Sequence, residues 1–292
     1  MEEFEVSASS RKTKQVYIST VISIALVLLM IGLLGLMLVH ARNLSNYVKE
    51  NIVLNIIVSD GAKEVDVLSL QKQIDTHPYV LHTQYVSKEI AAQNLQKDLG
   101  EDFLQFLGYN PLLSTIDVYM KAEHANNESI QAFSNQLTKN PLVKEVIYQK
   151  SLIDMVNQNI RIIGLVILAF AAVLLIIAVA LINNTIRLAI YSQRFLIKSM
   201  QLVGATRGFI RRPFLGYGIL HGFLGGLIAV ILLLLTLYLA QQQIPELIVL
   251  RNWFEFGAVF AAVVIIGILI SGLSTYFAVS KYLRLKIYNL YR

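Results

Sequence analysis

Four long apolar runs divide this chain of 292 residues, and polar segments separate them. The runs contain no Asp, Lys or Arg, and their one Glu is Glu255, at the rim of the last run. Each run reaches the ~20 residues that a helix needs to cross ~30 Å of hydrocarbon, where charge is costly. The pattern therefore predicts four transmembrane helices, over Val16–Val39, Ile162–Ile182, Phe214–Leu239 and Phe254–Val279.

Charged residues outside the runs are segregated by sign. Residues 183–213 carry six Lys or Arg and residues 280–292 carry four, with no acid in either segment, whereas residues 40–160 carry ten against fourteen Asp or Glu. Short basic segments stay on the cytoplasmic side of a membrane. Both termini and residues 183–213 are therefore expected inside, and residues 40–160 and 240–253 outside.

The expected fold is a membrane α-helical bundle of four transmembrane helices with an α+β extracytoplasmic domain. Along the chain, we predict a cytoplasmic tail (1–15), the first span (16–39), the outer domain (40–160) with an inserted lobe (88–114), the second span (161–182), a cytoplasmic loop (183–213), the third span (214–239), a short outer loop (240–253), the fourth span (254–279) and a cytoplasmic tail (280–292).

The outer domain contains a pattern that recurs along the sequence. Apolar residues at helical spacing recur after 63 positions, alternating strand residues recur after 62, and Pro78 matches Pro141. Each half thus reads strand, helix, proline turn, strand, which predicts two βαβ repeats with both helices on one face of a sheet. The matched sets are Val67, Leu70, Ile74 with Ile130, Phe133, Leu137, and Leu54, Ile56, Val58 with Ile116, Val118, Met120.

The insertion between the two halves is rich in apolar residues that a two-half sheet does not need. A helix ending near Gly100 is followed by a short segment that can hardly bury its own side chains. Either these side chains cap the open end of the domain core, or they form an exposed patch that binds another protein. The residues concerned are Phe103, Leu104, Phe106, Leu107, Tyr109, Leu112 and Leu113.

The inner segment 183–213 predicts a basic amphipathic helix that stops at Gly204, because glycine suits the left-handed residue after a helix end. Such a helix beneath a membrane can lie on anionic headgroups. It can equally be received in a groove of a cytoplasmic partner. In that second interpretation the anchors are Phe195, Met200, Leu202 and Val203.

The third span carries small residues at four-residue spacing, at Gly218, Gly222 and Gly226. This spacing lets helices approach closely in lipid, so we predict helix packing within the bundle or across a dimer.

Several kinds of chemistry are excluded or unsupported by the sequence. There are no cysteines, so the outer domain folds without disulfides and no thiolate site is possible. The net charge of +6 lies beside the apolar runs, which favours a membrane surface over nucleic acid. The chain lacks phosphate-loop, zinc-protease and nucleophile-elbow motifs. We therefore expect no enzyme activity, no bound metal and no cofactor of its own.

With this topology in place, the chain resembles the bacterial cell-division family FtsX. The stretch between the second and third runs contains NTIRLAIY (184–191), MQLVGAT (200–206) and FIRRPF (209–214), and the outer insertion contains FLQFLGYNPL (103–112). The chain departs from the family pattern at Leu196 and Lys198, where acids are frequent, and at Leu113, where a second proline is frequent.

The resemblance implies a membrane subunit of an ABC-type complex in the bacterial plasma (inner) membrane at the division site. Its partner would be the ATPase FtsE, which binds the ATP, in a complex of two ATPases with a homodimer of this chain. The outer lobe would engage a peptidoglycan hydrolase or its activator, and other division proteins are possible partners beside membrane lipid. The coupling helix that docks on the ATPase would comprise Arg194, Phe195, Lys198, Met200, Gln201, Leu202, Val203, Gly204 and Ala205.

Two other classes of function compete with this relay. A permease exporting a lipid or peptide would need convergent polar side chains along the spans, of which the sequence indicates only His221. A membrane-anchored structural module without moving parts would not need the inner motif.

Overall fold

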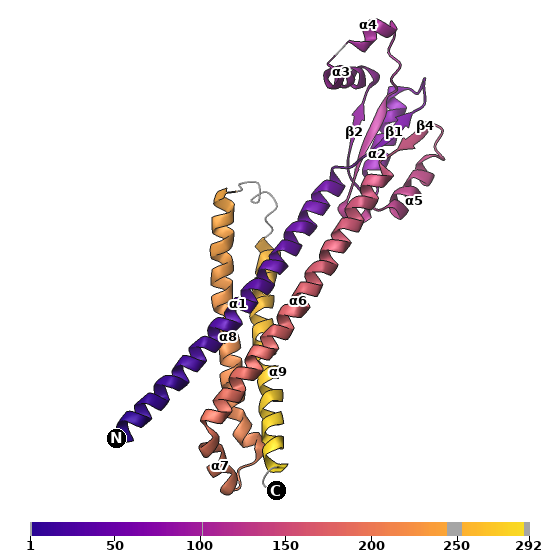
Figure 1. Ribbon diagram of the computed structural model, residues 1–292. Helices are drawn as coiled ribbons and strands as arrows, with labels where there is room; N and C mark the ends of the chain where they lie inside the picture. The colour runs from indigo at the N-terminus through magenta and orange to yellow at the C-terminus, as the bar shows by residue number, and fades with distance from the viewer. Residues whose placement is uncertain (1, 101, 244–252, 289–292) are drawn as a thin grey trace. The chain divides into compact units, whose positions relative to one another are not determined.

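The computed structural model describes residues 2–100, 102–243 and 253–288 (Figure 1). It separates into two compact units, which are described in turn. The membrane unit comprises Met1–His40 and Gly164–Arg292, and the outer unit comprises Ala41–Ile163.

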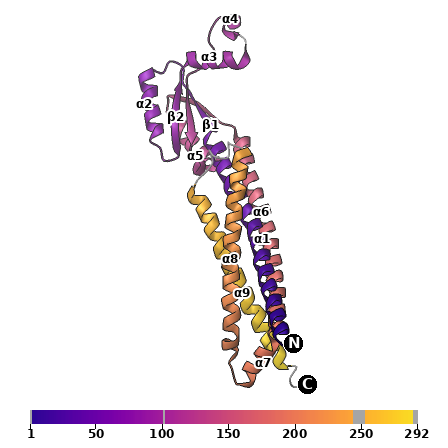
Figure 2. The ribbon, with the colours of Figure 1, turned by 90° about the vertical axis from the view of Figure 1, so that its left-hand side faces the viewer.

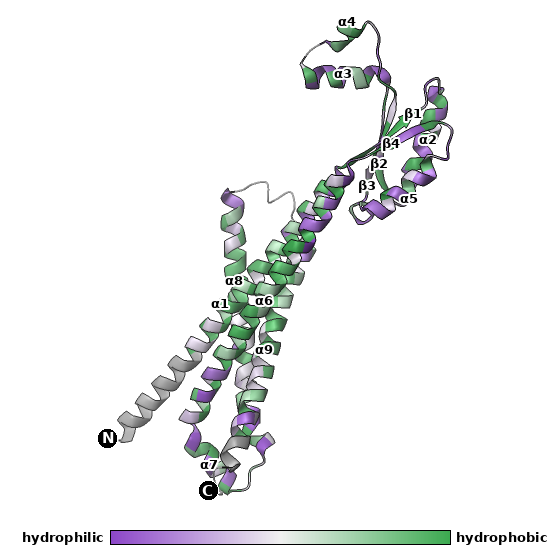
Figure 3. Cartoon of the chain, turned by 45° about the vertical axis from the view of Figure 1, so that its right-hand side comes forward, coloured by the Kyte–Doolittle hydropathy of each residue, from purple (hydrophilic) through white to green (hydrophobic). Residues whose placement is uncertain are grey.

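Long helices build the membrane unit: α1 (Glu2–Glu50), α6 (Lys150–Ser192), α8 (Arg207–Gln243) and α9 (Trp253–Tyr288), with the short α7 (Arg194–Leu202) between α6 and α8. All four long helices are long and apolar enough to cross a membrane, as predicted. Figure 3 shows hydrophobic residues along their middle parts and hydrophilic residues around α7. The helices extend beyond the apolar runs at both ends. For example, α6 continues without a break past residue 182 to Ser192.

Two buried apolar clusters join the membrane helices. Side chains from α1, α6, α8 and α9 meet in a buried cluster that includes Leu28, Ile182, Leu233 and Val263. A second cluster at the α7 end joins Ile190, Ile197, Ile210, Val279 and Leu283. Because lipid tails are as apolar as leucine, such contacts hold the bundle through close packing rather than through exclusion of water.

The outer unit is a four-stranded sheet with helices on one face. In chain order it consists of β1 (Val53–Val58), α2 (Glu64–Asp75), β2 (Val80–Val86), α3 (Lys88–Leu99), α4 (Phe103–Leu107), β3 (Thr115–Met120), a 3₁₀ turn (Ala122–His124), α5 (Asn127–Leu137) and β4 (Val143–Ile147). The strand order is β2–β3–β1–β4, and every pair of neighbours is antiparallel. Strands β1 and β2 are therefore parallel but separated by β3, and β3 and β4 are parallel but separated by β1.

The pairing register of the sheet is internally symmetric. Asn55 of β1 lies opposite Asp117 of β3, the residue 62 positions further along the chain. Asn55 also lies opposite Ile147 of β4, while Asp117 lies opposite Gln84 of β2. The β1–β4 and β3–β2 registers are thus related by the same offsets of 62 and 63 that appear in the sequence. The origin of this symmetry in a duplicated unit stays a prediction.

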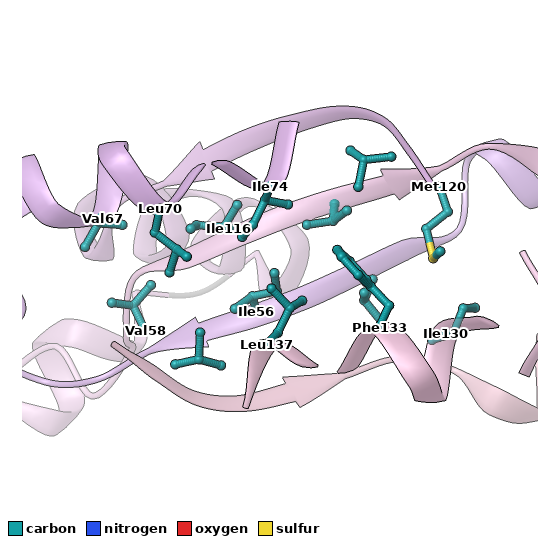
Figure 4. Packing of buried hydrophobic residues seen from close by; sticks show 14 of the residues in the cluster. Ile56, Val58, Val67, Leu70, Ile74, Ile116, Met120, Ile130, Phe133 and Leu137 are labelled. Carbon is teal, nitrogen blue, oxygen red and sulfur yellow. The ribbon is translucent and has the colours of Figure 1, made fainter. Parts of the chain in front are cut away.

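The core of the outer unit lies between the sheet and the helices α2 and α5 (Figure 4). The predicted helical stripes and the predicted inward strand residues are all buried there, which confirms the periodicities read from the sequence. In both Figure 1 and Figure 2, α3 and α4 lie beyond one end of the sheet, away from this core.

Candidate functional site

The outer lobe, residues 88–114 with α3 and α4, presents an apolar surface to solvent. Phe106 is 91% exposed, Tyr109 67% and Leu107 43%. The other four predicted residues, Phe103, Leu104, Leu112 and Leu113, are partly exposed, and the buried core of the outer unit is built without any of the seven. The structure thus places these residues together as a surface patch, not as the cap on the domain core that was the alternative.

No described residue of the lobe belongs to the buried core, and helix caps stabilise its two helices instead. The Ser87 hydroxyl accepts from the Ile90 backbone N–H at the start of α3, and the Asp102 carboxylate accepts from the Gln105 N–H at the start of α4. Gly100 (φ 70°) and Gly108 (φ 75°) end the two helices in the left-handed region that favours glycine. These caps support α4, whose Phe106 and Leu107 side chains remain exposed for contact.

Hydrogen bonds hold the two ends of the lobe together, and an ion pair links the lobe to the segment after β1. The Asn110 amide donates to the Lys88 carbonyl oxygen (2.9 Å) and accepts from the Leu112 N–H (3.0 Å). Lys88 also forms an ion pair of 2.6 Å with Asp60, and this hydrogen bond raises the pKa of Lys88 and lowers that of Asp60. Both groups are exposed, so the pair fixes geometry more than it adds stability.

The inner surface is the exposed side of α7 and the turn after it. Phe195 is 71% exposed, Leu202 80% and Val203 90%, and Lys198 is exposed beside them. The Arg194 guanidinium lies 4.5 Å from the ring centroid of Tyr191 and 4.9 Å from that of Phe195. Large apolar side chains outside the membrane runs are a usual mark of a protein contact.

Not all predicted docking residues lie on this surface. Met200 and Ala205 are partly buried against the cluster of Ile190, Ile197 and Ile210. Gln201 is half-buried and Gly204 is exposed. The predicted anchor Met200 is therefore less available to a partner than Leu202 or Val203, because part of its side chain packs against this cluster.

The end of α7 fixes the direction of the exposed side chains. Gly204 has φ 88°, the Ala205 N–H donates to the Met200 carbonyl (2.9 Å) and the Gly204 N–H donates to the Gln201 carbonyl (3.1 Å). This pair of bonds is the Schellman arrangement, which confirms that Gly204 stops the helix. The Thr206 hydroxyl then caps α8 by accepting from the Phe209 N–H.

The three predicted packing glycines all face α9. A Cβ at Gly222 would collide with the Gly267 carbonyl oxygen and lie 2.8 Å from the Ser271 Cβ, and one at Gly226 would lie 3.0 Å from the Val264 Cα. Gly218 lies against Thr275, and its carbonyl accepts from the Ser271 hydroxyl at 2.6 Å. The α8 and α9 backbones therefore approach each other within one chain.

The sequence missed a polar cluster inside the bundle. Thr20, Thr185, His221, Ser271 and Thr275, from four helices, line a cavity of about 30 Å³. A cavity of this size has room for about one water molecule. The sequence alone does not predict this cluster, because its residues lie on four separate helices and form no motif along the chain.

The outer unit also holds a histidine whose charged form is disfavoured. Burial, followed by the charge of nearby His124, lowers the pKa of His77. Its ring lies 4.6 Å from that of Phe133, and its Nδ1 accepts from the Tyr79 N–H (3.3 Å), which requires that nitrogen to be unprotonated.

Lowering the pH from 7.5 to 5.5 should therefore destabilise the outer unit. A folded-state pKa below the unfolded value near 6.5 means that the unfolded chain binds more protons as pH falls, so stability is lost on that side. Denaturant unfolding of a fragment 45–155 should show a lower midpoint at pH 5.5, and His77→Gln should flatten this dependence. An equal pH dependence in His77→Gln would contradict the assignment.

Comparison with known proteins agrees with this geometry. The arrangement defines a membrane protein with an α+β domain between the first two of its four apolar helices. A model of the FtsX extracellular domain matches residues 51–160, and a model of the FtsX-like permease C-terminal region matches residues 168–283.

Relatives similar to this chain over most of its length include two proteins named cell division protein FtsX. The cell division protein FtsX of Flavobacterium johnsoniae is 38% identical and the match covers 94% of each chain, while that of Bacillus anthracis is 30% identical over 78% of this chain and 76% of the relative. The crystal structure of extracellular domain 1 of FtsX from S. pneumoniae matches 33% of this chain and 93% of that one, at 16% identity and a TM-score of 0.29. The chain belongs to the FtsX family.

Proposed function

We propose that this chain is the non-enzymatic membrane subunit of a division-site complex that relays ATP-driven motion across the plasma membrane. Its ATPase would be FtsE, in a complex of two ATPases with a dimer of this chain and with both termini in the cytoplasm. The outer unit, built from two strand–helix–strand repeats as its symmetric register supports, would act on a peptidoglycan hydrolase or its activator.

The observation that carries the proposal is the continuity of α6. This helix begins at Lys150 in the outer unit and ends at Ser192, two residues before α7 begins. A displacement of α7 therefore has an uninterrupted helical path into the outer unit. For such a relay to work, the ATPase must bind two states of the chain with different affinity.

Two exposed apolar surfaces support partners on both sides of the membrane. The inner surface offers Phe195, Leu202 and Val203, which a groove of the ATPase would receive, with Lys198 as a charged neighbour. The outer lobe offers Phe106, Leu107 and Tyr109, as an anchor cluster for the hydrolase or activator. ATP would bind to the partner, which leaves this chain the task of transmitting motion.

The alternative, export of a lipid or peptide, receives less support. Within the spans, the polar cluster around His221 surrounds a cavity of about 30 Å³, far below the ~300 Å³ at which small-molecule sites begin. Transport by the complex in reconstituted vesicles would favour this alternative.

Phe106→Asp should abolish capture of the hydrolase or activator while the outer unit stays folded. The side chain is 91% exposed, so the charge remains hydrated and costs the fold little, but an aspartate at the centre of an apolar contact should weaken binding about thirtyfold or more. Capture by the full chain from an envelope extract, with circular dichroism of the fragment 45–155, measures both effects. Leu81→Asp, at an exposed residue of β2 outside the lobe, is the matched control. Undiminished capture by Phe106→Asp would refute the role of the lobe.

A further inference from the structure

The α7 end of the bundle holds a basic cavity that the relay does not use. The cavity has a volume of about 610 Å³ and opens between α8 and α9. Its lining combines three cations, a hydroxyl and two aromatic rings: Arg207, Arg211, Lys281, Ser280, Tyr276 and Phe277. A smaller cavity of about 240 Å³ between α6 and α9 shares Lys281 and Phe277 and adds Arg187.

Among the side chains that the structure describes, no carboxylate pairs with a cation of this cavity. The sequence has no Asp or Glu between Asp154 and Glu246, and none after Glu255. Within the described residues, the ion pair found joins Lys88 to Asp60 in the outer unit. Four cations gathered without an acid among the described side chains raise the local potential, which a bound anion would lower.

Arg211 is oriented within this cavity. Its guanidinium lies 4.1 Å from the ring centroid of Tyr276 and donates to the Ser280 hydroxyl at 3.1 Å. These contacts from α9 fix the plane of the fork and use one of its five N–H groups, which leaves the others for a ligand. A fixed guanidinium fork matches the oxygens of a phosphate better than a mobile ammonium does.

The position of the cavity along the membrane helices indicates that a phosphate bound there would belong to a lipid headgroup. Arg211 precedes Phe214, the start of the third apolar run, by three residues or ~4.5 Å along the helix, and Lys281 follows the end of the fourth run at Val279 by two. Both runs exceed the ~20 residues that span hydrocarbon, so their ends reach the headgroup layer. Phe277, 65% exposed, and Tyr276, 40% exposed, lie at the same level, as aromatic side chains at a membrane interface do.

We propose that this cavity binds the phosphodiester headgroup of an anionic phospholipid. Arg211 and Lys281 hold the phosphate oxygens, and Arg207 contributes further positive potential. Phe277 lies against the part of the acyl chain nearest the headgroup. The bound headgroup links α8 to α9 at the end of the bundle that carries α7. A lipid at this position would therefore stabilise the platform on which the inner surface rests.

Native mass spectrometry of the full chain in detergent, titrated with phosphatidylglycerol or phosphatidylcholine, tests the site. We expect saturable binding of phosphatidylglycerol, lowered about fivefold by Lys281→Gln and by Arg211→Gln, since one cation near a membrane surface contributes about that factor. Arg212→Gln removes the same charge from an exposed neighbour that does not line the cavity, and should leave binding unchanged.

A charge-conserving variant separates the built site from a general effect of positive charge. Arg211→Lys keeps the charge but loses the guanidinium fork, so it should recover only part of the binding that Arg211→Gln loses, and a thermal unfolding curve shows whether either variant is misfolded. Full recovery in Arg211→Lys would overturn the role of the oriented fork. Equal losses in Arg212→Gln, or equal binding of phosphatidylcholine, would overturn the site. Displacement of phosphatidylglycerol by inorganic phosphate would assign the cavity to free phosphate. Unchanged lipid binding with lost ATPase co-purification would assign the cations to the partner protein.

Discussion

Leu202→Asp combined with Val203→Asp is expected to abolish co-purification of FtsE with this chain. These side chains are 80% and 90% exposed, so neither contributes to the core that holds α7 on the bundle. Placing a carboxylate on an apolar anchor that enters a partner's groove costs ~2 kcal/mol or more, about thirtyfold in affinity for each residue. The measurement is the amount of ATPase retained by the tagged full chain in detergent.

Ser192→Asp is the matched control for this variant. It adds one carboxylate, against the two of the double variant, at an exposed residue just before α7 and outside the proposed anchors. Its ATPase retention should equal that of the wild type, and deletion of residues 198–204 should reproduce the loss seen in the double variant. Normal retention by the double variant would remove α7 from the docking interface.

Gly222→Ala is expected to destabilise the membrane unit, although alanine is normally the better helix former. The added Cβ would meet the Gly267 carbonyl oxygen and the Ser271 Cβ, and a backbone atom cannot move aside as a flexible side chain can. Overpacking of this kind costs about 1–3 kcal/mol, and Gly222→Val should exceed that because its branches also clash. Thermal unfolding in detergent should show a clearly lower midpoint.

Gly216→Ala provides a comparison in the same helix. A Cβ at Gly216 meets no atom within 4 Å, so alanine should leave stability unchanged or raise it by up to ~1 kcal/mol through its helix propensity. The two alanine variants therefore differ clearly in their effect on stability. Equal midpoints for Gly216→Ala and Gly222→Ala would show that the close α8–α9 approach does not hold the bundle.

The helices, their buried faces and one helix end were predictable from the sequence because each depends on a local pattern. The four apolar runs, the buried stripes of α2 and α5 and the stop at Gly204 each follow from spacing or from the backbone conformation that one residue favours. The symmetric offsets of 62 and 63 also reappear in the strand register. The order of the strands, however, depends on which strand inserts between two others, and no local pattern encodes that.

The inner and outer surfaces were predictable only in part. The sequence identified apolar residues where a soluble segment should be polar, but it could not tell which of them pack inward. Met200 and Val203 illustrate this limit, since both were predicted anchors, but Val203 is 90% exposed while Met200 is partly buried against the bundle. The cavity of Arg211, Tyr276 and Lys281 depends on contacts between distant helices, which are invisible in a single sequence.

The most direct test of the relay is hydrogen exchange of the outer lobe in the complex with FtsE. Amide exchange of residues 88–114 would be compared with and without ATP, using an ATPase variant that binds ATP but cannot hydrolyse it. The relay predicts a change in protection in the lobe when ATP binds, and loss of that change in the Leu202→Asp and Val203→Asp double variant. Identical exchange in the lobe with and without ATP, in a complex whose α7 does respond, would contradict transmission across the membrane.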